Sequence, residues 1–328
     1  MHGSISARAL RLLLVGLITL TLTACPAPGG GPAPVRLLTF PGTPELTFVQ
    51  AIQGAQRRVL VTVYLLTDLR IVDALAAARA KGLEVRVLLE GNPYGATVAA
   101  QATLTRLQEA GIAVKAGNPA FRYTHQKSLI TDDSAYILTN NLTRAAVQAN
   151  REFGIVIEGT AEVSEIVGAF EADWARTPFA PANPRLIWSP LNSRSRLTGM
   201  IDAARTSLEI YAEVVQDDAI VAALGRAAQR GISTRVLIAP ADAGSTAEGN
   251  GDVGVLLGAG VQVRVLRNPY AHAKVIIVDA SSAFVGSQNL TFTSIERNRE
   301  LGITIGDPGA LRSLRATFEA DWASVSAP

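Results

Sequence analysis

Two short segments of this sequence place a histidine two residues before a lysine and seven residues before an aspartate. They contain His125, Lys127 and Asp132 in one case, and His272, Lys274 and Asp279 in the other. An imidazole beside an ammonium group suits a phosphate diester. The ring nitrogen can attack phosphorus or deliver a proton, while the lysine neutralises charge on the non-bridging oxygens. Two histidines are needed, because forming a phosphohistidine with one requires an acid for the leaving group, and that acid later acts as a base on water.

The composition supports a chemical role for these residues. The chain has three histidines, and both of those beyond His2 lie in the two motifs. Only four of its 30 basic residues are lysines, and two of the four are Lys127 and Lys274. Where charge alone is needed this sequence uses arginine, so lysine at these positions indicates a geometric need for a compact ammonium group.

A metal site is the main rival chemistry. Zinc and magnesium sites need clustered neutral imidazoles, thiolates or carboxylates, and two histidines flanked by lysines make a poor cation pocket. The chain has one cysteine, Cys25, and no His-Glu-x-x-His or Asp-x-Asp pattern. We therefore expect a site that uses neither a metal ion nor another cofactor.

The two motifs belong to two copies of one unit. Gly82 and Gly231 stand at equivalent places in similar segments, and the six residues from Phe170 recur identically from Phe318. The triplet Asn150-Arg151-Glu152 likewise recurs as Asn298-Arg299-Glu300. Register kept over such a length indicates a duplication, so one chain can supply both halves of a single site. We expect a monomer that contains an internal pseudo-dimer.

Each copy predicts alternating strands and helices. A β-branched run at 59–64 precedes an alanine-rich helical stretch at 71–80, with Gly82 at its end, and a second apolar run follows at 85–89. Further strands are predicted at 127–131, 135–138, 274–278 and 283–285. The expected fold class is α/β: two duplicated α/β sandwich halves, each a mixed β-sheet flanked by helices, related by a pseudo-twofold axis.

These patterns set the expected boundaries of the chain's parts. The first half covers 41–177, a connector rich in Pro and Asn covers 178–190, and the second half covers 191–328. Residues 26–40 are predicted to be a Pro/Gly-rich tether, and residues 1–25 a signal peptide.

The N-terminal segment predicts export. Two arginines precede an apolar run from Leu12 to Leu22, and the following Leu22-Thr23-Ala24-Cys25 resembles the bacterial lipobox, in which the cysteine is lipidated. We expect a membrane-anchored lipoprotein of the bacterial cell envelope, facing the periplasm or the exterior. The alternative is an ordinary signal peptide cut nearby, with Cys25 incidental.

The duplicated His-x-Lys-x4-Asp motif followed by Gly-Ser-x-Asn resembles the phospholipase D superfamily, over about residues 45–326. The resemblance implies that one histidine is the nucleophile and the other the general acid. It also implies that the hydroxyl and amide residues after each motif bind the phosphate, namely Thr139, Asn141, Ser287 and Asn289. The first copy departs from the pattern, with Leu138 and Thr139 in place of glycine and serine.

The resemblance further assigns the remaining acids. Glu152 and Glu300 occupy the positions of a family acid that orients the histidine. The motif aspartates, Asp132 and Asp279, belong with the catalytic candidates, although each could instead tie its strand and turn together. In family members with two motifs the first histidine is more often the nucleophile, which favours His125, but the near-symmetry of the halves makes either order chemically reasonable.

Several functions remain compatible with this site. We favour a phospholipase D activity that hydrolyses phospholipid head groups at a membrane reached through the lipid anchor. Outside the first 25 residues the chain has 28 basic and 28 acidic residues, which gives no support for binding a polyanion. The alternatives are a metal-independent nuclease, a phosphatidyltransferase similar to cardiolipin synthases, and a scaffold that binds envelope partners without catalysis.

Overall fold

Two β-branched runs form the central strands of two sheets. The computed structural model describes residues 1, 34–240 and 253–326, and both halves of the duplication lie in the compact unit Pro32–Pro328. The central strands are β2 (Arg58–Val63) and β9 (Ser207–Ala212), which are buried on both faces for almost their whole length. Strands that are buried on both faces tend to be continuous apolar runs and do not alternate apolar and polar residues strictly. The sequences of β2 and β9 are of this continuous kind.

The first half continues around β2 in the order that the repeat predicts. Its elements are β1 (Arg36–Phe40), α1 (Thr47–Gly54), β2, α2 (Leu69–Ala80), β3 (Glu84–Leu89), α3 (Thr97–Glu109), β4 (Ala113–Ala116), β5 (Ser128–Thr131), β6 (Ser134–Leu138), α4 (Arg144–Gln148), β7 (Asn150–Glu158) and α5 (Ala161–Ala175). The strands are ordered β1-β7-β6-β5-β2-β3-β4. Strands β2, β3 and β4 are parallel and the other neighbours in this order are antiparallel, so the sheet is mixed.

The second half repeats this arrangement. Its elements are β8 (Leu186–Ser189), α6 (Ser193–Asp202), β9, α7 (Asp218–Gln229), β10 (Ser233–Ile238), α8 (Val253–Gly258), β11 (Gln262–Val265), β12 (Tyr270–Ala271), β13 (Val275–Val278), β14 (Ser282–Gly286), α9 (Phe292–Glu296), β15 (Glu300–Ile305) and α10 (Pro308–Ser324). The order β11-β10-β9-β13-β14-β15-β8 matches that of the first sheet, strand for strand. The predicted fold class, with two duplicated halves and two mixed sheets flanked by helices, is confirmed.

Two predicted boundaries differ from the structure. Residues 36–40, expected in the tether, form β1 and pair antiparallel with β7, because Leu38 and Phe40 point into the core. Residues 186–189, expected in the connector, form β8 and pair with β15. Both are short edge strands, four or five residues long, beside segments rich in Pro or Gly that masked them in the sequence. Residues 2–33, including the predicted lipidation site Cys25, lie outside the described residues.

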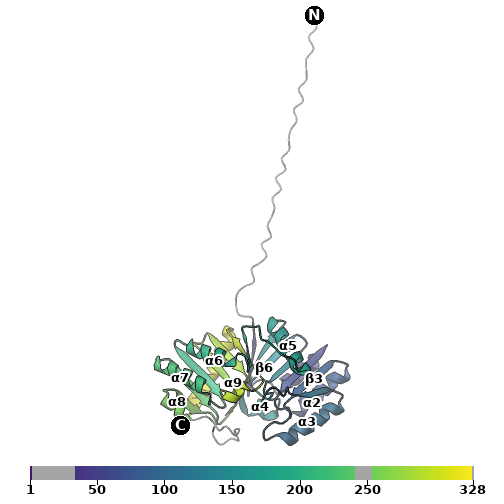
Figure 1. Ribbon diagram of the computed structural model, residues 1–328, viewed down its shortest axis with the longest axis horizontal. Coiled ribbons are helices and arrows are strands. Elements are labelled where there is room, and N and C mark those ends of the chain that lie inside the picture. Colours follow the sequence, from purple (N-terminus) through teal and green to yellow (C-terminus); the bar gives the residue numbers. More distant parts are fainter. Residues whose placement is uncertain (2–33, 241–252, 327–328) are drawn as a thin grey trace. The chain divides into compact units, whose positions relative to one another are not determined.

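The core is divided into layers by the two sheets. Helices α1, α2 and α3 cover the outer face of the first sheet, and α6 to α9 cover that of the second. The inner faces of both sheets meet in one central cluster, which also takes in α5 and α10. Figure 1 shows the two halves side by side, with α4 and α9 near the middle where they meet.

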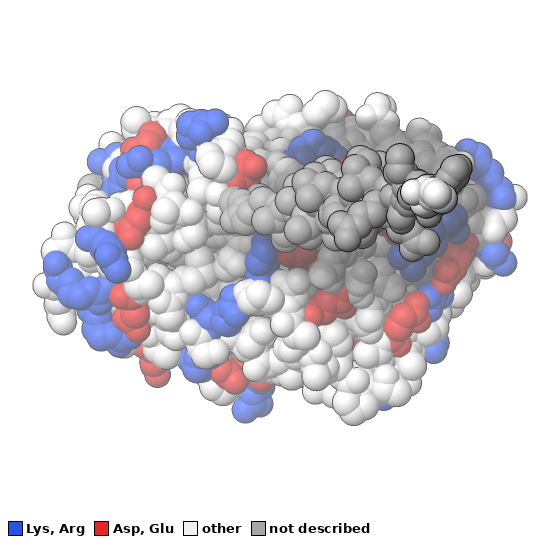
Figure 2. Space-filling view, turned by 90° about the horizontal axis from the view of Figure 1, so that it is seen from above, with Lys and Arg blue, Asp and Glu red and all other residues white. Residues whose placement is uncertain are grey.

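Charges of both signs are spread over one face of the molecule. Figure 2 shows basic and acidic side chains interspersed over the described residues of one face. No helix in the described part of the chain is long and apolar enough to cross a membrane.

Candidate active site

Each histidine motif is held by the backbone of the opposite half. The His125 and Gln126 N–H groups donate to the Arg299 carbonyl oxygen, at 2.9 and 2.7 Å. The His272 N–H donates to the Arg151 carbonyl oxygen at 3.3 Å, and β12, just before His272, pairs with the start of β7. The Asn-Arg-Glu triplet of one half is thereby placed against the motif of the other.

The glutamates of these triplets cross to the histidines of the opposite half. His125 Nδ1 lies 2.9 Å from Glu300 Oε1, and His272 Nδ1 lies 2.5 Å from Glu152 Oε1. Both glutamates are fully buried. A carboxylate beside Nδ1 favours the ring proton on that nitrogen, which leaves Nε2 as the nitrogen that can act on a substrate. Both acids lie where an orienting role would place them, and that role stays a prediction.

Each of these glutamates also accepts a hydrogen bond from a hydroxyl group. Thr139 Oγ1 donates to Glu152 Oε2 at 2.5 Å, and Ser294 Oγ donates to Glu300 Oε1 at 2.6 Å. Ser287 Oγ accepts from the Leu301 N–H at 3.1 Å. Here the structure differs from the sequence-based expectation, which assigned Thr139 and Ser287 to the phosphate. Both are fully buried with their hydroxyls in these bonds, so they act through the glutamates and the backbone.

Two lysines lie buried beside the histidines. Lys127 Nζ lies 2.9 Å from His125 Nε2, and Lys274 Nζ lies 3.4 Å from His272 Nε2. Burial, together with the charge of Lys274, lowers the pKa of Lys127 to about 7. Burial also lowers the pKa of His125, despite the opposing charge of Glu300. Because Lys274 acts on His125, groups from both halves belong to one electrostatic site.

The two predicted asparagines border this site. The residue after Asn141 donates its N–H to the Leu65 carbonyl oxygen, just beyond the end of β2, and the residue after Asn289 donates to the Val214 carbonyl oxygen, just beyond the end of β9. The side-chain oxygens of Asn141 and Asn289 are buried without a hydrogen-bond partner. An amide oxygen accepts hydrogen bonds and would need a donor such as water, so only the NH2 groups of these side chains could donate to a phosphate oxygen. Both residues stay candidates for binding phosphate on that ground.

The motif aspartates lie at the far ends of the motif strands. Asp132 accepts from the N–H groups of Gln56, Arg57 and Arg58, and Asp279 accepts from those of Arg205, Thr206 and Ser207. Burial alone would raise the pKa of Asp132, but these N–H donors hold it below its usual value. The structural alternative is therefore the one that the geometry favours, and the place of both aspartates among the catalytic candidates is corrected.

The sequence analysis missed two side chains of the site. Tyr64 and Glu213 are equivalent in the repeat, each the first residue after the central strand of its half. The Tyr64 ring lies 4.9 Å from the His125 ring, edge to face. Glu213 Oε2 lies 2.9 Å from Lys274 Nζ and 3.5 Å from His272 Nε2. Residues at the end of a strand that neighbours a motif strand could be recognised as site candidates from the sequence. Tyr64 and Glu213 were missed because the comparison of the two copies looked for identical residues, and these two differ in type.

A pair of buried salt bridges ties the halves together next to the site. Arg151 Nε lies 2.6 Å from Asp321 Oδ2, and Arg299 Nε lies 2.7 Å from Asp173 Oδ2. Each joins the arginine of one Asn-Arg-Glu triplet to the identical C-terminal helical segment of the other half. The segments that recur in the sequence therefore contact one another across the interface.

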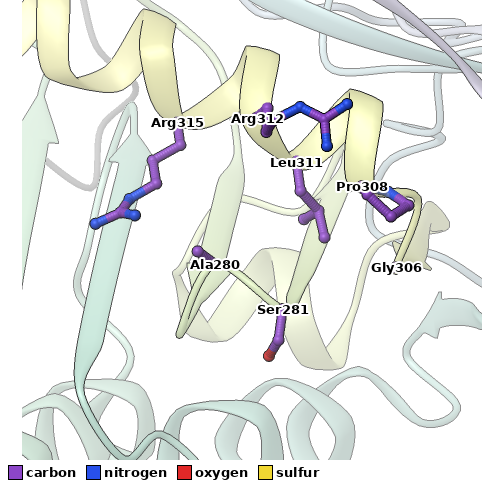
Figure 3. Close-up of a pocket in the computed structure, with 7 residues that line it drawn as sticks. All are labelled: Ala280, Ser281, Gly306, Pro308, Leu311, Arg312 and Arg315. Carbon is purple, nitrogen blue, oxygen red and sulfur yellow. The ribbon is translucent and has the colours of Figure 1, made fainter.

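No group of three or more potential ligands that could hold a metal ion occurs within residues 34–240 and 253–326. A recess of about 280 Å³ lies beside α10, lined by Ala280, Ser281, Gly306, Pro308, Leu311, Arg312 and Arg315 (Figure 3). Ala280 follows β13 whereas His272 precedes it, so this recess lies at the opposite end of the strand from the histidines. It is not part of the site described above.

The chain has recognisable relatives. Residues 48–174 and 197–322 each match the family model described as "Cardiolipin synthase, PLD-like domain". Cardiolipin synthase A of Pseudomonas aeruginosa is 31% identical over 170 residues, which cover 50% of this chain and 33% of that protein. Cardiolipin synthase B of Salmonella typhimurium is 24% identical over 323 residues, covering 82% of this chain and 76% of that protein. This chain thus spans about a third of the first relative and three quarters of the second.

The fold is also found in a solved structure. Phosphatidylserine synthase from Haemophilus influenzae gives a TM-score of 0.69 at 12% identity, over 90% of this chain and 87% of that one. At this identity the likeness concerns the arrangement of the backbone.

Proposed function

The chain belongs to the phospholipase D superfamily, and from that membership we propose that it cleaves phosphodiester bonds of phospholipids through a phosphohistidine. The observation that carries the proposal is the reciprocal pairing of each histidine with the buried glutamate of the other half. This pairing presents two imidazoles, each beside a buried carboxylate and a neighbouring lysine, to one phosphate.

The reaction follows from these groups. One histidine uses Nε2 to form a bond to phosphorus, the bond from phosphorus to the leaving oxygen breaks, and the other histidine gives its proton to that oxygen. Water then bonds to phosphorus, the same second histidine takes its proton, and the phosphorus–nitrogen bond breaks. The lysines and the amides of Asn141 and Asn289 offset the charge that grows on the non-bridging oxygens.

Transfer is the second candidate, because two relatives are named cardiolipin synthases. If the hydroxyl of another phospholipid replaces water, the same steps give a transferase. Hydrolysis and transfer differ only in the acceptor that reaches the phosphohistidine.

One assay separates these outcomes. The purified protein is incubated with phosphatidylglycerol vesicles, and the products are resolved by mass spectrometry. Hydrolysis releases glycerol and leaves phosphatidate, whereas transfer joins two lipids into cardiolipin. We expect phosphatidate, and we expect neither product from the His125→Ala or His272→Ala variant. Cleavage of single-stranded DNA without turnover of lipid would instead make the protein a nuclease.

We also propose that the protein is exported and anchored by lipid at Cys25. This rests on the sequence pattern, and it would concentrate the domain at its substrate. Growth with radiolabelled palmitate should label the wild-type chain and leave Cys25→Ala unlabelled. Equal labelling of both would contradict the anchor.

A further inference from the structure

The two halves of the site differ in one charged side chain. The place after the central strand holds Tyr64 in the first half and Glu213 in the second. Around these positions the histidine, the lysine and the orienting glutamate are the same in both halves. An aromatic ring therefore borders His125 where a carboxylate borders His272, and the substitution adds a negative charge to only one side of an otherwise symmetric site.

Glu213 is tightly engaged. Its side chain is 17% exposed, and its Oε2 contacts both Lys274 Nζ and His272 Nε2. Burial alone would raise the pKa of Glu213, but the charges of His272 and Lys274 outweigh it and hold the pKa well below its usual value. The group is therefore a carboxylate throughout the neutral range, and it faces the ring nitrogen that Glu152 leaves free.

The charges around the two imidazoles follow from these contacts. His272 faces the carboxylates of Glu152 and Glu213, and the ammonium group of Lys274 lies 3.3 and 3.4 Å from its two ring nitrogens. His125 faces the carboxylate of Glu300 and the ammonium group of Lys127, with the uncharged ring of Tyr64 alongside. Lys274 also acts on His125, and His125 acts on Glu213. A second carboxylate stabilises the imidazolium form, whereas a neighbouring ammonium group and burial favour the neutral ring.

We propose that Glu213 is a positioning residue that stabilises the imidazolium form of His272 and so suits His272, rather than His125, to the role of general acid. The order of the two roles is the one that the family resemblance implies, and the new inference is that Glu213 sets it. The proposal rests on the proposed function, since both roles refer to phosphodiester cleavage. In the first step His125 Nε2 bonds to phosphorus as the leaving oxygen departs with the proton from His272. In the second step His272, now neutral, takes a proton from water, whose oxygen displaces His125. The proton returns to the ring beside Glu213, so the site is reset with atoms and charge balanced.

The test compares Glu213→Gln with two other variants. Glu213→Asp keeps the charge. Glu209→Gln removes a buried carboxylate from β9, the strand that Glu213 follows, and this carboxylate pairs with Arg235 outside the site. If one histidine must act as an acid, turnover of the wild type should fall at alkaline pH. In Glu213→Gln that fall should move to lower pH, because the carboxylate beside His272 Nε2 is gone. Glu213→Asp should return the alkaline fall to the pH of the wild type, and Glu209→Gln should not change that pH.

Two further readouts separate a positioning role from a structural one. The few histidines make imidazole signals easy to follow by NMR, with single substitutions assigning each signal. Deprotonation of His272 should occur at lower pH in Glu213→Gln, and rapid quenching should trap the phosphoryl group on His125.

An equal loss of activity at every pH, with the alkaline fall unmoved, would overturn the proposal, as would a phosphoryl group on His272. If the wild type cleaves no phosphodiester, the proposed function fails. The NMR titration still tests Glu213 in that case, because it needs no turnover.

Discussion

Removal of Asp321 tests how the two halves are held together. Its carboxylate lies in α10 of the second half, and it accepts from Arg151 Nε and Nη2 of the first half at 2.6 and 3.0 Å. Tyr211 also donates to it, at 2.7 Å. Arg151 and Asp321 are 9% and 6% exposed, so Asp321→Ala leaves an arginine charge buried without its partner. Breaking a buried pair from one side costs about 3–5 kcal/mol.

The matched control is an exposed pair in the same half. Arg226 and Asp202 have side chains that are 49% and 41% exposed, and they form the same kind of two-pronged contact. Asp202→Ala should cost less than about 1 kcal/mol, because solvent already screens that pair. Urea unfolding followed by circular dichroism measures both variants against the wild type at the same pH and salt.

The expected result is a large loss for Asp321→Ala and a small one for Asp202→Ala. Arg151 precedes Glu152, which orients His272, so we also expect Asp321→Ala to lose activity at temperatures where it remains folded. Equal free energies of unfolding for the two variants would refute the reasoning that this buried pair locks the interface.

Three further predictions follow from the site. Lys127→Met should abolish turnover yet raise the melting temperature, because a buried ammonium group is replaced by an apolar chain. The pKa of Lys127 is about 7 in the folded protein and 10.5 in the unfolded chain, so between these pH values the unfolded state binds more protons. The free energy of unfolding of the wild type should therefore rise as the pH increases from about 7 to 10.5. The Lys127→Met variant should not show this rise. A melting temperature that falls in the variant would contradict this. Asp132→Ala removes the acceptor of three N–H groups and should lower the free energy of unfolding by about 1–3 kcal/mol while turnover persists. As a control, Asp133→Ala at the exposed neighbouring residue should change it by less than about 0.5 kcal/mol. Loss of turnover in a folded Asp132→Ala variant would return this aspartate to the catalytic residues. Activity should survive EDTA, and loss of turnover that a divalent ion restores would overturn the metal-independent site.

Much of the fold could be predicted from the sequence because the pattern that indicates each helix or strand occurs in both copies of the repeat. A helix such as 69–80 has an apolar face and a glycine just beyond its end in both copies, so each copy supports the other. Edge strands such as β1 and β8 lack this advantage. Their few residues resemble loop sequence, and only their pairing with β7 and β15 makes them strands.

The site was predictable where a residue's role depends on its type and spacing. His125, Lys127 and their counterparts were identified in this way, whereas the glutamates of the Asn-Arg-Glu triplets were assigned from the family resemblance. The roles of Thr139 and Glu213 could not be predicted, because each depends on which groups the other half brings beside it. A hydroxyl near a phosphate site suggests a phosphate contact until the structure shows that Glu152 occupies it.

The most direct test of the central claim, that both histidines serve one phosphodiester, uses a substrate whose leaving group needs no acid. Bis(p-nitrophenyl) phosphate is mixed with the His272→Ala variant, and p-nitrophenolate and the intact protein mass are measured together. The account predicts a burst of about one p-nitrophenolate per protein, with the phosphoryl adduct retained on His125, because the base that activates water is missing. No burst and no adduct, or an adduct that still forms in the His125→Ala variant, would contradict it.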